Sequence, residues 1–139
     1  MNRTVTILLV EDDIVDVMGI QRGLKKHKVA NPTVHASNGR EALDIMRGNG
    51  HPKLQRPYLV LCDINMPEMN GLEFLDELRQ DKELSDTVVF MLTTSKADED
   101  RISAYAHHVA GYIVKSDAGS EFLRLISMLD MYWKIVEMP

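Results

Sequence analysis

Five short apolar runs, each followed by a longer amphipathic segment, constrain the fold of this chain more than any other feature of its sequence. The runs cover residues 5–10, 33–37, 58–62, 87–92 and 111–114. Some are apolar at nearly every position, as in Ile7-Leu8-Leu9-Val10, and that pattern is typical of strands covered by helices on both faces. The alternation therefore predicts an α/β fold with an open, doubly wound parallel sheet of five strands.

The segments between the runs have helical periodicity. The first helix has an apolar face that we expect to pack on the sheet, formed by Ile14, Val17, Met18 and Leu24. The turn at 37–39 predicts a second helix that stops at Gly48. Further helices are predicted over 72–78, over 97–107 and along the apolar stripe between residues 122 and 133.

Length and composition limit the classes of protein to consider. A chain of 139 residues fits one domain, 1–139. A net charge of −5 without a basic stripe argues against nucleic acid as the main partner. No apolar stretch approaches the roughly 18 residues of a membrane span, and no secretory signal precedes the first strand. With a single cysteine, Cys62, in a buried run, we expect a cytoplasmic protein that has no disulfide.

Charged and hydroxyl side chains come directly after four of the five runs. They are Glu11, Asp12 and Asp13 after the first run, Asp63 after the third, Thr93 and Thr94 after the fourth, and Lys115 after the fifth. The carboxyl ends of parallel strands share one edge of a sheet, and ligands of open α/β sheets bind there. We therefore expect the functional site of this chain to lie at that edge of the sheet.

Three of these carboxylates predict a cation site. Glu11, Asp12 and Asp63 would repel one another, and a hard cation such as Mg²⁺ relieves that repulsion. The backbone carbonyl of Asn65, in the loop after Asp63, is a candidate further ligand. Asp13 is instead expected to begin the first helix, where a carboxylate accepts from exposed N–H groups.

The remaining polar residues at the edge favour phosphoryl transfer. An aspartate nucleophile such as Asp63 is already ionised at neutral pH, so it needs positioning and charge neutralisation and no general base. Lys115 can supply a compact positive charge. The hydroxyl of Thr93 can donate to a phosphoryl oxygen.

Four fragments together resemble the receiver domain of two-component response regulators along essentially the whole chain. They are Leu8-Leu9-Val10-Glu11-Asp12-Asp13, Leu61-Cys62-Asp63-Ile64-Asn65-Met66-Pro67 with Asn70-Gly71, Met91-Leu92-Thr93-Thr94-Ser95, and Tyr112-Ile113-Val114-Lys115. The resemblance implies a flavodoxin-like (βα)5 fold with strand order 2-1-3-4-5. It also implies a signalling switch, not an enzyme, that accepts a phosphoryl group from a histidine kinase.

The same resemblance implies a role for each site residue. Asp63 is the phosphoacceptor, Asp12 a direct ligand of Mg²⁺ or Mn²⁺, and Glu11 a ligand through water. Thr93 and Lys115 match the switch hydroxyl and the invariant lysine of the family. Tyr112 falls on the aromatic switch position, and Asn65 and Ser95 are expected to tune the rates.

One residue departs from the family pattern. The family has a proline in a cis peptide after the lysine, whereas Ser116 follows Lys115 here. A cis bond before a residue other than proline costs about 3–4 kcal/mol. We therefore expect either a trans bond at Lys115–Ser116 or a shifted loop after the fifth strand, and the sequence does not decide between cis and trans.

The chain also looks like the small response regulators that partner phytochrome-type histidine kinases. It shares with them the Lys-Ser pair, a long loop before the third strand and an extended last helix that carries Trp133. The likeness implies a homodimer formed through the fourth helix, the fifth strand and the fifth helix. Because no effector domain follows Pro139, we expect output through protein contacts.

Two other functions remain open at this point. A metal-dependent phosphohydrolase also passes through an aspartyl phosphate, but its nucleophile follows the first strand, whereas Asp63 follows the third. A binding module could keep the fold without phosphorylation, although the complete acidic set argues against that. The cognate kinase, the signal and the target cannot be read from the sequence.

Overall fold

The computed structural model describes residues 5–26, 31–93 and 109–114, and of residues 112–114 it describes the backbone alone. The elements are β1 (Thr6–Val10), α1 (Ile14–Lys26), β2 (Thr33–Ala36), α2 (Gly39–Arg47), β3 (Tyr58–Asp63), α3 (Gly71–Gln80), β4 (Val88–Thr93) and β5 (Gly111–Val114). This is the predicted alternation, and the strand limits differ from the predicted ones by at most one residue at either end. The helices expected over 97–107 and 122–133 lie outside the described residues.

The strands form one parallel sheet, hydrogen-bonded in the order β2-β1-β3-β4-β5. The chain runs from β1 outward to β2 and then crosses back to β3 on the other side of β1. This reversal beside β1 is the switch in strand order at which open α/β sheets bind ligands. Both β1 and β3 are central strands, so they are buried on both faces and are apolar at nearly every position.

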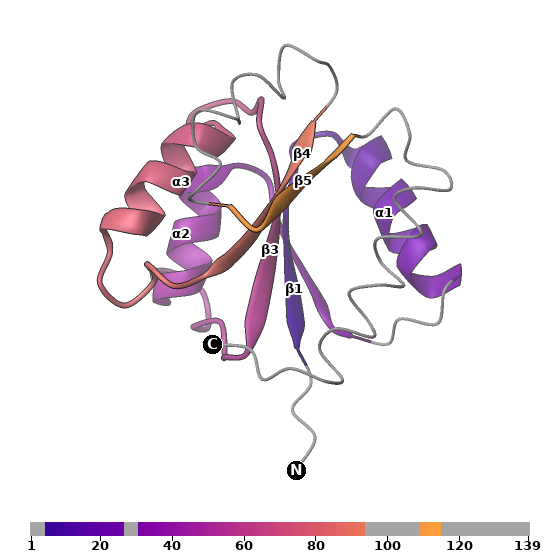
Figure 1. Cartoon of the computed structure of the whole chain (residues 1–139). Coiled ribbons are helices and arrows are strands. Elements are labelled where there is room, and N and C mark those ends of the chain that lie inside the picture. The colour runs from indigo at the N-terminus through magenta and orange to yellow at the C-terminus, as the bar shows by residue number, and fades with distance from the viewer. Residues whose placement is uncertain (1–4, 27–30, 94–108, 115–139) are drawn as a thin grey trace.

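Helices cover both faces of the sheet, with α2 and α3 on one side and α1 on the other (Figure 1). The first face packs Leu43 and Met46 of α2 and Phe74 of α3 against alternate strand residues such as Val60. The second packs α1 against the strand residues that point the other way. None of the described helices has the length and apolar character to cross a membrane.

The predicted apolar face of α1 is correct for Val17 and Leu24 and wrong for two of its members. Ile14 is 61% exposed and Met18 is 49% exposed, whereas Ile20 is buried. Successive residues of a helix are turned by about 100°, so Met18 points well away from its buried neighbour Val17. The arc that packs on the sheet is centred on Val17, Ile20 and Leu24, and Ile14 and Met18 lie on its flank.

Side-chain caps fix where α2 and α3 begin. Asn38 accepts the N–H of Glu41 at 2.9 Å, and α2 then closes at Gly48 as predicted. Asn70 and Glu73 form a reciprocal capping box at the start of α3. Both caps lie at the carboxyl edge of the sheet and therefore set the path of the loops that surround it.

Candidate functional site

An acidic cluster forms at the carboxyl ends of β1 and β3, as predicted. Val10 pairs with Cys62, so the next residues, Glu11 and Asp63, lie level with each other on adjacent strands. A carboxylate oxygen from each of Glu11, Asp12 and Asp63 lies within 4.8 Å of the others. The strand register alone therefore brings together residues that are about fifty positions apart in the sequence.

The burial of this cluster suits a hard cation. Glu11 is 0% and Asp63 is 5% exposed, while Asp12 is exposed. Buried carboxylates at such short separation repel one another, and oxygen ligands of this kind are the ones that Mg²⁺ and Mn²⁺ prefer. The donor set therefore fits a divalent cation that also contacts solvent on the side of Asp12.

The end of β3 is held in place from several sides. Ile64 N–H donates to Asp63 Oδ1 at 2.9 Å, and Gly71 N–H donates to the carbonyl of Ile64 at 2.9 Å. A Cβ on Gly71 would overlap the carbonyl oxygen of Asp63, so the first residue of α3 touches the backbone of the acidic residue. Cys62 is buried as expected, and its Sγ donates to the Asp63 carbonyl at 3.2 Å.

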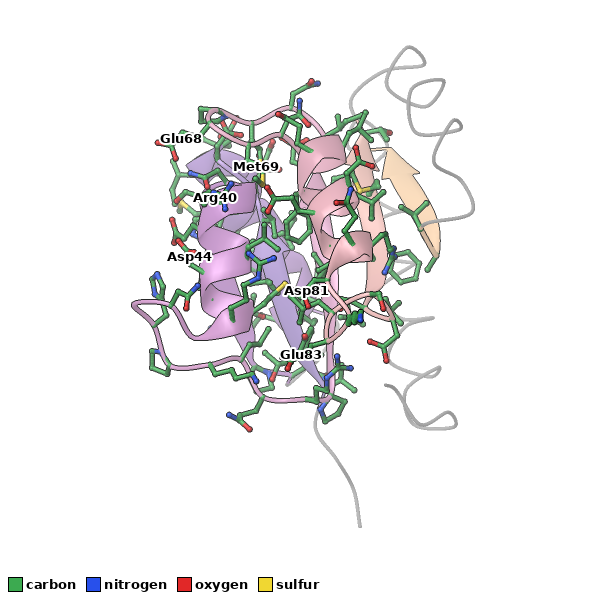
Figure 2. All side chains as sticks on the ribbon, turned by 90° about the vertical axis from the view of Figure 1, so that its left-hand side faces the viewer. Arg40, Asp44, Glu68, Met69, Asp81 and Glu83 are labelled. Carbon is green, nitrogen blue, oxygen red and sulfur yellow. The ribbon has the colours of Figure 1, made fainter. Side chains whose placement is uncertain are left out.

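The loop between β3 and α3, which contains the exposed Asn65, is held by the start of α2. Gly39 N–H donates to the carbonyl of Met69 at 3.1 Å. Asn38 Nδ2 also donates to Glu68 Oε2 at 3.4 Å, and Glu68 adopts a left-handed backbone with φ 63°. Glu68 and Met69 lie beside the upper end of α2 (Figure 2).

Asp13 begins α1, as predicted. Its Oδ1 accepts the N–H of Val15 at 2.9 Å and that of Asp16 at 3.4 Å. The N–H of Asp13 in turn donates to Glu11 Oε1 at 3.2 Å. Asp13 therefore caps α1 with its side chain and orients the Glu11 carboxylate with its backbone N–H.

The hydroxyl residue of the predicted site lies on the neighbouring strand. Leu92 pairs with Asp63, and the buried Thr93 follows as the last residue of β4 at the same edge. The backbone of Tyr112 belongs to β5, opposite Met91. Thr94, Ser95 and Lys115, together with the Lys115–Ser116 bond, lie outside the described residues, as does the side chain of Tyr112.

Two contributors to the site were missed in the sequence. His35, near the end of β2, places its Nε2 2.7 Å from the backbone carbonyl oxygen of Glu11. Gly71 makes the close approach to Asp63 described above. A polar residue inside a strand that neighbours β1 was the only available signal for His35, and Gly71 was interpreted as part of a turn.

A model of the family described as "Response regulator receiver domain" matches residues 7–127. The chain belongs to this family. Receivers are phosphoacceptor proteins of two-component signalling and are not enzymes, so the phosphohydrolase alternative is discarded. The acidic cluster of Glu11, Asp12 and Asp63 is the acidic pocket of this receiver.

Several solved structures that are similar to this receiver are named as phytochrome or bacteriophytochrome response regulators. Response regulator Rcp1 of Synechocystis sp. is 31% identical over 128 residues, which are 91% of this chain and 87% of Rcp1. The structure of the phosphorylated cyanobacterial phytochrome response regulator RcpA is 31% identical with a TM-score of 0.82, covering 99% of both chains. The Mn²⁺-bound form of Rcp1 is 29% identical with a TM-score of 0.76, covering 96% of this receiver and 98% of that chain.

Proposed function

We propose that Asp63 is the phosphoacceptor of a signalling switch and receives its phosphoryl group from a sensor histidine kinase. The observation that carries this proposal is the meeting of the Glu11, Asp12 and Asp63 oxygens within 4.8 Å of one another at the switch in strand order. Asp63 is the last residue of β3, and its carboxylate accepts the N–H of Ile64. The carbonyl of Ile64 in turn accepts the N–H of Gly71, which fixes the chain just after Asp63. A nucleophile fixed in this way has the positioning that phosphoryl transfer requires.

The transfer needs little from the protein beyond orientation and charge. A carboxylate oxygen of Asp63 forms a P–O bond while the P–N bond of the phosphohistidine breaks, and the imidazole leaves with the electron pair of that bond. Asp12, Asp63 and the Asn65 carbonyl would hold Mg²⁺ or Mn²⁺, with Glu11 bound through water. The cation supplies neutralisation of the charge on the phosphoryl oxygens.

Two further groups are proposed to contact the phosphoryl oxygens. Thr93 follows Leu92, the register partner of Asp63. Its hydroxyl is therefore assigned to donate a hydrogen bond to a phosphoryl oxygen once Asp63 is phosphorylated. Lys115 comes directly after β5, which pairs with β4 at Thr93, and is assigned as the ion-pair partner. Asn65 and Ser95 are assigned to the adjustment of phosphorylation and dephosphorylation rates.

The output of the switch is assigned to the far edge of the sheet. We propose that Tyr112 on β5 responds to Thr93 and that the fourth helix, β5 and the fifth helix complete the (βα)5 fold. This face would then change its binding of a partner or of a second copy of the chain as a homodimer.

The partner is proposed from the relatives. Rcp1 and RcpA resemble this receiver over most of their length, and RcpA is named as a phytochrome response regulator. A phytochrome-type histidine kinase is therefore the proposed phosphoryl donor. Residues 1–139 are proposed to form one cytoplasmic receiver domain without a nucleic-acid partner.

Incubation with a small acyl phosphate and Mg²⁺, followed by intact mass measurement, tests the phosphoacceptor. The unaltered chain should gain the mass of one phosphoryl group, and it should gain none when the metal is chelated. Asp63→Asn removes the nucleophile and should block the gain. Asp76→Asn, which changes an exposed aspartate on α3, is the matched control and should be modified like the unaltered chain.

Phosphorylation of the Asp63→Asn protein to the same extent as the control would refute the assignment of Asp63. A gain that survives complete chelation would refute the role of the cation. Phosphotransfer from a panel of purified histidine kinases then identifies the donor class. Preferential transfer from phytochrome-type kinases is the expected result.

A further inference from the structure

The imidazole of His35 makes a contact with the acidic pocket that the phosphorylation chemistry does not use. Its Nε2 lies 2.7 Å from the backbone carbonyl oxygen of Glu11. A carbonyl can only accept, so Nε2 carries the hydrogen and donates it. His35 is half-buried on β2, opposite Leu9 in the register, so its ring reaches along the sheet toward the carboxyl edge.

The contact lies at the carboxyl end of the pairing between β1 and β2. Glu11 N–H donates to the carbonyl of Ala36 at 2.9 Å, and β2 ends at Ala36. Two residues later, Asn38 is the N-cap of α2, so the chain leaves the sheet here. The imidazole of His35 bonds the carbonyl of Glu11 at the point where the two strands part.

This bond fixes one particular peptide plane. The carbonyl of Glu11 and the N–H of Asp12 belong to the same peptide group, which is planar. The orientation of that group sets ψ of Glu11 and φ of Asp12, the two backbone torsions between the Cα atoms that carry the two carboxylates. Both carboxylates belong to the acidic pocket, so the orientation of this one peptide group affects two proposed cation ligands.

We propose that His35 is a positioning residue for the cation site, and that it acts by holding the Glu11–Asp12 peptide through the Nε2–H···O=C bond. The inference rests on the proposed function insofar as that function places a divalent cation among Glu11, Asp12 and Asp63. His35 does not touch the cation. Its effect is to preorganise the acidic pair before the cation binds.

Four variants separate this role from a merely structural one. His35→Leu and His35→Phe remove the donor, and phenylalanine keeps a ring of similar shape. His35→Gln keeps a donor, because its amide nitrogen lies as far along the side chain as the imidazole Nε2, and it carries no charge. His51→Leu removes an exposed imidazole from the loop before β3, at the opposite edge of the sheet, and is the matched control.

The dissociation constant for Mg²⁺ is measured by titration calorimetry without any phosphoryl donor, and the unfolding temperature is measured in chelator. Loss of a hydrogen bond that orients metal ligands typically costs 10–100-fold in affinity. Because His35 acts through the backbone and not on a carboxylate, we expect a loss of about three- to tenfold for His35→Leu and His35→Phe. His35→Gln and His51→Leu should stay within about twofold of the unaltered chain, as expected where the donor geometry is kept.

The results decide whether His35 positions the cation ligands or only stabilises the fold. A purely structural role predicts lower unfolding temperatures in chelator with unchanged Mg²⁺ affinity, and that result would overturn the proposal. A loss in His35→Gln as large as that in His35→Leu would also overturn it, since the donor would then be irrelevant. Failure of the unaltered chain to bind Mg²⁺ would instead remove the proposed function itself.

A measurement on the unaltered protein decides the question if the variants that lack the donor do not fold. With ¹⁵N-labelled imidazoles, Mg²⁺ should shift the Nε2 resonance of His35 and leave that of His51 in place. The His35→Gln protein assigns the resonance. An unmoved His35 signal under saturating Mg²⁺ would show that this bond and the cation site are not connected.

Discussion

A methyl group added at Gly71 should damage both the fold and the phosphorylation site, because this residue touches the backbone of Asp63. The new Cβ would overlap the carbonyl oxygen of Asp63 and would lie 2.9 Å from Ile64 Cα and 2.9 Å from Met91 Cε. Met91 can move its terminal methyl group. The two backbone atoms can yield only if the end of β3 or the start of α3 is displaced.

The magnitude follows from two opposing terms. Overpacking of a close-packed interior costs about 1–3 kcal/mol, and contact with backbone places Gly71→Ala toward the upper end. Alanine in place of glycine in a helix recovers at most about 1 kcal/mol. We therefore expect a net loss of about 2 kcal/mol in the free energy of unfolding. With a urea dependence of about 1–3 kcal/mol per molar, the midpoint should fall by roughly 1 M.

Urea unfolding followed by circular dichroism measures this loss, and Gly19→Ala provides the control. Gly19 lies on the exposed side of α1, and a Cβ there would have no neighbour within 4 Å. Gly19→Ala should therefore raise the free energy of unfolding by up to about 1 kcal/mol, and the urea midpoint should rise with it. A displaced Asp63 should also accept phosphoryl groups at least about tenfold more slowly from a small acyl phosphate.

The opposite signs at the two glycines are the decisive result. If Gly71→Ala leaves the midpoint unchanged or raises it as Gly19→Ala does, the close approach of α3 to Asp63 is not present in solution. A lower midpoint with an unaltered phosphorylation rate would show that the fold absorbs the strain away from Asp63. Either outcome would refute the link between α3 and the reacting carboxylate.

Three other predictions follow from the described residues. Asn70→Ala removes the capping box of α3 and should lower the free energy of unfolding by about 1 kcal/mol, whereas Asn70→Ser should retain most of it in the same urea assay. Burial raises the pKa of the Tyr58 phenol above 10.0, so the unfolded chain ionises first as pH rises. The free energy of unfolding of the unaltered chain should therefore fall as the pH rises above 10. The urea midpoint of Tyr58→Phe, measured across the same pH range, should fall less. In thermal unfolding, Mg²⁺ should stabilise the unaltered chain and not Asp12→Asn. In chelator, Asp12→Asn should be the more stable protein by roughly 1 kcal/mol, because one repulsive charge is gone.

Much of the fold could be predicted because its elements have strong local signals. The buried strands are continuous apolar runs, and Asn38 and Gly48 mark the ends of α2 in the sequence. The face of α1 was harder to predict. Ile14 and Met18 are as apolar as Val17, and only the position of the helix over the sheet decides which of them is buried.

The candidate site was predictable where its residues directly follow strands, and not where a contact depends on the exact end of a strand or on the path of a loop. Glu11 and Asp63 each follow an apolar run, so the rule for parallel sheets brings them together. The contact of His35 with Glu11 depends on where β2 ends relative to β1, and no short motif encodes that. The approach of Gly71 to Asp63 depends on how tightly the intervening loop returns.

The bond between Gly39 and Met69 has a consequence for sequence variation and for engineering. A Cβ on Gly39 would meet Met69 Cγ and Phe74 Cβ, each at 2.8 Å. A smaller residue at 69 would remove the first contact, but every residue except glycine carries a Cβ, so the second contact yields only if α3 moves away from α2. Position 39 should therefore remain glycine among relatives that keep this spacing of α2 and α3. A loop graft that carries residues 64–70 into another receiver must therefore bring positions 39 and 74 with it.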